Sequence, residues 1–94
     1  MAKLIYVDGG EREVFPKSTR RGFTLQELYD LIPCTTVEHI ELADGKGMWM
    51  NEDGKYDPKL KPNARATELL HAAGGIPDDR VVGNVLITDR GEVR

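Results

Sequence analysis

Hydrogen-bond donors gather between residues 51 and 67, where Asn51-Glu52-Asp53-Gly54-Lys55 is followed by Leu60-Lys61-Pro62-Asn63. Asp-Gly between short apolar or aromatic runs is typical of a tight hairpin. Pro-Asn before an alanine-rich stretch predicts a helix start. The turn and the helix entrance would then bring amide and cationic groups together, and such groups bind anions. We therefore predict a site for a small anionic, nucleotide-like ligand, formed by Asn51, Lys55, Asn63, Arg65 and Thr67.

Residues that could break bonds are scarce. Ser18 is the only serine, and no Gly-x-Ser-x-Gly motif surrounds it. Cys34 and His39 could form a nucleophile pair, but Cys34 follows a proline that ends a helix and is more simply a small packed residue. We expect no catalytic residue and no enzymatic activity.

Metal binding is poorly supported as well. The two histidines and one cysteine do not have the spacing of a structural zinc site. Asn51-x-Asp53-Gly54 resembles the start of a calcium loop but lacks the glycine offset and the closing acid. The sequence indicates neither a metal nor a cofactor.

Two further surfaces offer alternatives. The basic loop before the first helix, with Lys17, Arg20 and Arg21, could contact nucleic acid. Trp49 could be a core residue or an interface anchor, because strand alternation places it opposite the two methionines beside it. With Glu38 and Glu41 it could form an acidic protein-binding face, although a charge cluster is more often only solvated.

The bulk composition indicates one small domain over residues 1–94, because a chain of this length cannot build a second core. The net charge of −3 makes nucleic acid an improbable general partner. A single cysteine excludes an internal disulfide and favours a reducing compartment. No apolar run approaches the roughly 20 residues of a membrane helix. We expect a soluble protein of the host-cell cytoplasm and, since so small a core gains from a partner, a homodimer.

The pattern of elements predicts an α+β domain of order ββαββαβ. Gly9-Gly10 separates two β-rich runs, and Thr24 with Glu27 matches a capping box before a helix that Pro33 ends. Strands are expected at 36–42 and 48–50, a second helix at about 63–73, and a buried, central strand at 81–87. We expect a mostly antiparallel sheet with both short helices on one face, and a frayed tail at 92–94.

The chain resembles a family of small proteins of unknown function encoded by phages, plasmids and other mobile elements. The resemblance rests on Leu-Gln-Glu-Leu at 25–28, Ile-Glu at 40–41, Asn-Glu-x-Gly-Lys at 51–55, Leu-x-x-Asn at 60–63 and Val-x-Gly-x-x-x-Ile at 81–87. It covers residues 4–87, with a longer insertion at 74–79 and a basic loop at 17–21 that the family pattern does not require. It implies a mobile-element origin and no particular activity.

These observations favour a non-catalytic binding protein that counters or modulates a host process by sequestering a small anionic ligand. One alternative is a protein–protein inhibitor of a host defence or nucleic-acid enzyme, of anti-restriction or anti-CRISPR type. A small nucleic-acid-binding regulator is another.

Overall fold

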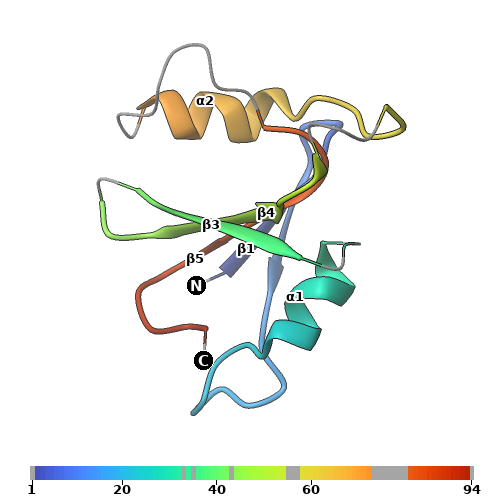
Figure 1. Cartoon of the computed structure of the whole chain (residues 1–94). Coiled ribbons are helices and arrows are strands. Elements are labelled where there is room, and N and C mark those ends of the chain that lie inside the picture. Colours follow the sequence, from blue (N-terminus) through green and yellow to red (C-terminus); the bar gives the residue numbers. More distant parts are fainter. Residues whose placement is uncertain are drawn as a thin grey trace.

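The computed structural model describes residues 2–32, 34, 36–42, 44–54, 58–72 and 81–93. Within these ranges, five strands form one antiparallel sheet and two helices accompany it, in the order β-β-α-β-β-α-β (Figure 1). The elements are β1 (Ala2–Ile5), β2 (Glu11–Val14), α1 (Leu25–Leu31), β3 (Val37–Glu41), β4 (Gly47–Asn51), α2 (Ala64–Ala72) and β5 (Val85–Thr88). The predicted α+β class and element order are confirmed.

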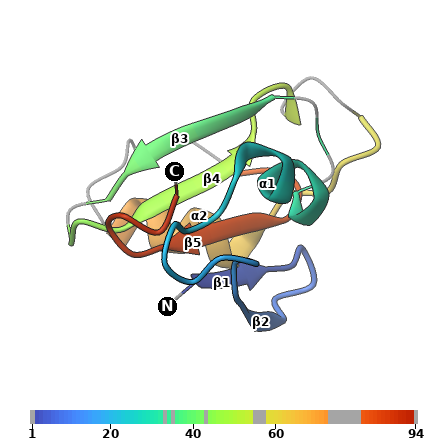
Figure 2. The same cartoon turned by 90° about the horizontal axis from the view of Figure 1, so that it is seen from below.

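The sheet is assembled from two hairpins joined by the last strand. Its order is β2-β1-β5-β4-β3, so that β5 lies between the β1–β2 and β3–β4 hairpins (Figure 2). All four β5 residues are buried, as the continuous apolar run predicted. The prediction of a central closing strand is confirmed, although the strand itself begins at Val85.

The two helices cover opposite faces of this sheet, which corrects the expectation that they share one (Figure 1). On one face, Ile5, Met48 and Val85 form a cluster with Ala66 and Leu70 of α2. On the other, α1 contributes to a second cluster, whose buried members are Ala2, Leu4, Val14, Phe23, Leu28, Ile32 and Leu86. Because β5 is apolar on both sides, each of its faces needs a cover, and one helix supplies each.

Helix α1 begins with the capping box that the sequence indicates. The Glu27 amide donates to Thr24 Oγ1 at 3.2 Å, and the Thr24 amide donates to Glu27 Oε1 at 3.1 Å. Leu28 and Ile32 are buried on the inner side of the helix, whereas Leu25 is 49% exposed. The periodic apolar pattern is therefore only partly used for the core.

The chain contains three Asp-Gly pairs, and two of them, Asp8-Gly9 and Asp44-Gly45, lie in the turns of the β1–β2 and β3–β4 hairpins. Gly45 has φ +86° and closes the β3–β4 turn, where its amide donates to the Leu42 carbonyl at 2.9 Å. Gly54 is buried and has no positive φ, and among the described residues between it and α2 no strand follows. The positive-φ turn predicted at Asp53-Gly54 is therefore wrong, and residues 55–57, where the second strand of that hairpin would run, lie outside the described residues.

The segment after β5 packs on the body of the protein rather than fraying. Phe23, fully buried, forms a parallel bridge with Val93, and its amide donates to the Glu92 carbonyl at 2.6 Å. Gly22, at φ +85°, leaves room for this contact, since a Cβ there would overlap Glu92 O. The frayed tail expected at 92–93 is therefore corrected; Arg94 lies outside the described residues.

Candidate ligand-binding site

Asn63, predicted as a ligand donor, is entirely used inside the fold. Its side chain is 0% exposed, and Oδ1 accepts from the Ala66 amide at 3.0 Å, which makes Asn63 the N-cap of α2. Its Nδ2 donates to the carbonyls of Ile5 at 3.1 Å and Gly83 at 2.9 Å. The amide thus ties α2 to β1 and to the approach to β5, and the structure removes Asn63 from the ligand site.

Thr67 has a similar structural role. Its hydroxyl donates to the Asn63 carbonyl at 2.8 Å and accepts from the Val81 amide at 2.9 Å. The Asn63 carbonyl belongs to the N-cap of α2, and the Val81 amide belongs to the segment before β5. Thr67 therefore fixes α2 to the segment that leads into β5, and its hydroxyl is not free for a ligand.

Leu60 explains why the stretches around Gly54 and Gly83 meet. A Cβ at either glycine would lie 3.6 Å from Leu60 Cδ1, so the leucine side chain packs against both. Gly83 has φ +80° and its amide donates to the Lys61 carbonyl at 2.9 Å. The segments that carry the donor-rich sequence therefore meet. The contacts that join them are mainly apolar packing and backbone hydrogen bonds rather than contacts between the polar side chains.

A cavity of about 340 Å³ opens beside this junction. Its lining residues come from the β1–β2 loop, the end of α1, the end of β4 and the segments before α2 and β5: Val7, Ile32, Asn51, Lys59, Leu60, Lys61, Gly83 and Asn84. We call it the Leu60 cavity. Of the five predicted ligand residues only Asn51 lines it, while Lys55 lies outside the described residues.

Two carboxamides in the Leu60 cavity have fixed orientations. Asn51 Oδ1 accepts from the Asp53 amide at 2.9 Å, and Asn84 Oδ1 accepts from the Val7 amide at 3.2 Å. With each oxygen engaged by a backbone N–H, the Nδ2 groups of the two half-buried residues are left to donate. Asn84 was missed by the sequence prediction, which treated it only as part of a strand.

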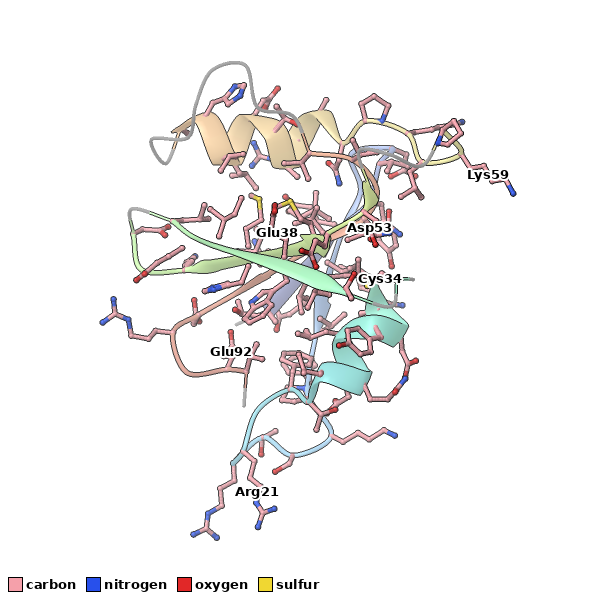
Figure 3. All side chains as sticks on the ribbon, in the orientation of Figure 1. Arg21, Cys34, Glu38, Asp53, Lys59 and Glu92 are labelled. Atoms are coloured by element: carbon pink, nitrogen blue, oxygen red, sulfur yellow. The ribbon has the colours of Figure 1, made fainter. Side chains whose placement is uncertain are left out.

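Lysines are the charged residues of the cavity lining. Lys59 and Lys61 are exposed and lie just before α2, and Figure 3 shows the Lys59 side chain extending outward from that segment. No aspartate or glutamate is among the described lining residues. Donors therefore outnumber anionic groups around a partly apolar wall, which suits a ligand with acceptor oxygens.

Comparison with known proteins gives a family. A model described as "Domain of unknown function (DUF3846)" matches residues 2–93. The chain belongs to the DUF3846 family. This agrees with the resemblance to an uncharacterised family, and the DUF3846 match covers every strand and helix described above. Neither a curated protein nor a solved structure matches the chain, so the site itself must suggest the activity.

Arg65 lies in a different part of the DUF3846 chain from Asn51. Its guanidinium forms ion pairs with Glu11 of β2 at 3.5 Å and with Glu68, one turn along α2, at 3.6 Å. It lines a groove between α2 and the sheet that shares no lining residue with the Leu60 cavity. The five predicted residues therefore do not form one pocket.

The predicted acidic interface also divides between two faces of the sheet. Glu38, labelled in Figure 3, pairs in register with Met50, on the α2 side. Glu41 pairs with Gly47, on the same side as Trp49. Trp49 is half-buried; its Nε1 donates to Thr88 Oγ1 at 3.0 Å, and its ring stacks on His39 with centroids 4.2 Å apart. Trp49 and Glu41 can share a surface, but Glu38 cannot belong to it.

Cys34 and the metal-ligating residue types are the remaining candidates for chemistry in the DUF3846 chain. Burial raises the pKa of the Cys34 thiol, against a smaller lowering by a hydrogen bond to the Thr36 backbone, which disfavours the thiolate that a nucleophile needs. Across the described ranges, no group of three or more His, Cys, Asp or Glu residues could hold a metal ion. No helix in those ranges reaches the length and hydropathy that a membrane span requires.

Proposed function

We propose that this DUF3846 protein is a non-catalytic binding protein whose Leu60 cavity takes a small anionic, nucleotide-like ligand. The observation that carries the proposal is the pair of Asn51 and Asn84 carboxamides, whose oxygens are engaged by the backbone and whose NH₂ groups remain for a ligand. Fixed donors lose little entropy when they bind, so they give orientation as well as affinity.

The cavity lining suggests how the ligand lies. Its phosphate or carboxylate oxygens would accept from the two carboxamides and from Lys61 at the rim. Its ring or other apolar part would contact the wall that Val7, Ile32 and Leu60 provide. The cavity volume is near the lower end for small-molecule sites, which favours a mononucleotide or a smaller anion over a dinucleotide.

The residue types around the cavity support binding rather than turnover. Its described lining includes no serine, cysteine, histidine or carboxylate, the usual nucleophiles and general bases. Together with the phage and plasmid resemblance of the sequence, this leads us to propose sequestration of a host metabolite or signal as the biological effect.

A thermal-shift and calorimetric screen tests the proposal. The probes are inorganic phosphate, nucleoside monophosphates and cyclic nucleotides, each at fixed ionic strength. A ligand present at 100 times its Kd stabilises the folded state by about 2.7 kcal/mol. For a domain of this size that shift corresponds to a rise in Tm of about 10–20 °C.

Two variants locate the binding. Lys61→Glu reverses one charge in the lining, and Asn51→Asp keeps the oxygen that accepts from Asp53 but removes the NH₂ donor. Each should weaken binding by about tenfold or more, the loss expected for one charge-assisted hydrogen bond. Lys46→Glu, which changes the net charge equally but lies outside this cavity, is the matched control and should bind normally. No response to any probe, or an equal loss in Lys61→Glu and Lys46→Glu, would refute the proposal.

A further inference from the structure

A second groove, which shares no lining residue with the Leu60 cavity, lies between α2 and the sheet. Its volume is about 330 Å³, and its floor is apolar, with Ile5 of β1, Ile87 of β5 and Leu69 of α2 among its lining residues. Leu42, which directly follows β3, also lines it. We call it the α2 groove. These side chains continue the core cluster of the α2 face out to the surface.

Most of the charged groups that line the α2 groove are already engaged. Glu11 accepts the Arg65 ion pair at 3.5 Å, and Asp44 Oδ1 accepts from the Lys46 amide at 3.0 Å. Neither Lys3 nor Lys46 forms an ion pair with a described residue, and both side chains are exposed. Lys3 thus lies beside an apolar floor without an ion-pair partner among the described residues, whereas Lys46 lies near the carboxylates of Asp44 and Asp89. The described lining still has one more cation than carboxylates, because Lys3, Lys46 and Arg65 face Glu11 and Asp44.

We infer that the α2 groove binds an amphiphilic anion, with an aliphatic or aromatic body on the floor and a carboxylate or sulfonate at the lysine rim. Burying the body removes apolar surface from water, which favours binding. The head group then pairs with Lys3 at the groove margin, where Lys46 adds a second positive charge and water still screens both. The charge complementarity selects an anionic amphiphile over a neutral one, and this site is independent of the Leu60 cavity and of the function proposed for it.

The test uses 1-anilinonaphthalene-8-sulfonate, which combines an aromatic body with a sulfonate. The native protein should bind it with 1:1 stoichiometry under conditions in which near-UV circular dichroism shows intact tertiary packing, which separates this binding from that of a molten globule. Decanoate should displace the dye, and decanol, which has the same chain without the charge, should displace it at least about tenfold less effectively.

Substitutions then locate the site at which the dye binds. Lys3→Glu and Lys46→Glu should each weaken dye affinity by about threefold to tenfold, a range suited to partly screened charges. Arg65→Ala should weaken it too, because it leaves the Glu11 carboxylate unpaired beside the groove. Lys61→Glu, in the Leu60 cavity, is the matched control and should bind the dye normally.

Three results would overturn the inference: no stoichiometric binding by the native protein, equal competition by decanol and decanoate, or an equal loss in Lys46→Glu and Lys61→Glu. Nucleotide binding is tested with Lys61→Glu as the variant and Lys46→Glu as the control, and dye binding uses the same two variants in the opposite roles. A negative result for the dye therefore leaves the proposed function standing, and a negative result for nucleotides leaves this inference standing.

Discussion

Replacing Asn63 is expected to damage the fold rather than a ligand site. Asn63→Ala removes three hydrogen bonds at once: the cap on the Ala66 amide and the two donations to Ile5 O and Gly83 O. All three lie in a place from which water is excluded, since the side chain is 0% exposed. Water cannot replace the missing donors without opening the contact between α2 and β1.

The cost can be worked from these contacts. Loss of an N-cap costs about 1 kcal/mol. A buried polar group left without its partner costs about 1–3 kcal/mol. We expect the free energy of unfolding to fall by about 3–5 kcal/mol, a large share of the 5–14 kcal/mol or so that a domain of this size possesses. The Tm should fall by at least about 12 °C.

Two further variants separate the contributions. Asn63→Asp keeps an oxygen for the Ala66 amide but turns the NH₂ donor into an acceptor facing two carbonyls, so it should be at least as destabilised as Asn63→Ala. Thr67→Val, which removes the neighbouring hydroxyl but keeps the shape, should cost only about 1–2 kcal/mol. Urea unfolding followed by far-UV circular dichroism measures all three. If Asn63→Asp were as stable as the parent protein, the two carbonyl contacts could not have the importance assigned to them.

Two other perturbations test separate features. Gly22→Ala should lower the free energy of unfolding by about 2–4 kcal/mol, because it adds a Cβ that overlaps Glu92 O to the strain of a positive φ. Gly91→Ala, at φ +82° with open space around the Cβ position, is the matched control and should lose only about 1 kcal/mol in thermal unfolding; equal losses would contradict the role given to the Phe23–Val93 contact. For Cys34, burial raises the pKa of the thiol, so iodoacetamide at pH 7 should modify the folded protein at least about tenfold more slowly than the protein in urea. The folded-state rate should also begin to rise at a higher pH than the unfolded-state rate, and equal rates would show that the thiol is not shielded.

Features that depend on neighbours in the sequence could be predicted. The Thr24–Glu27 capping box needs only residues three positions apart, and it forms as expected. The order of strands and helices follows from local periodicity in the same way. Asp53-Gly54 shows the limit of such signals, because the dipeptide marks a primed turn only where the glycine takes a positive φ, and Gly54 does not.

The placement of the helices could not be predicted from their own periodicity. An apolar stripe shows which side of a helix is buried but not which face of the sheet it covers. The relevant signal lies in β5, whose Val85, Leu86 and Ile87 are apolar in succession and therefore need cover on both faces. The run predicts a buried strand, as observed, and its apolar residues on both faces are the feature that places one helix on each side of the sheet.

The candidate site was only partly predictable because its decisive contacts are distant in sequence. Asn63 donates to carbonyls 58 and 20 positions away, and nothing around it distinguishes such a residue from a surface donor. The Asn84 side chain is held in the lining of the Leu60 cavity by a hydrogen bond from the Val7 amide, 77 positions away. Donor residue types could be recognised from the sequence, but their depth and their partners are properties of the assembled sheet.

The central position of β5 has a consequence for biosynthesis. A nascent chain that has not yet extruded Val85–Thr88 from the ribosome holds two hairpins with no strand to join them. An isolated two-stranded hairpin is at best marginally stable in water. Cooperative folding must therefore wait until nearly all of the domain has been translated, and until then residues such as Leu4 and Met48 remain open to chaperones and proteases.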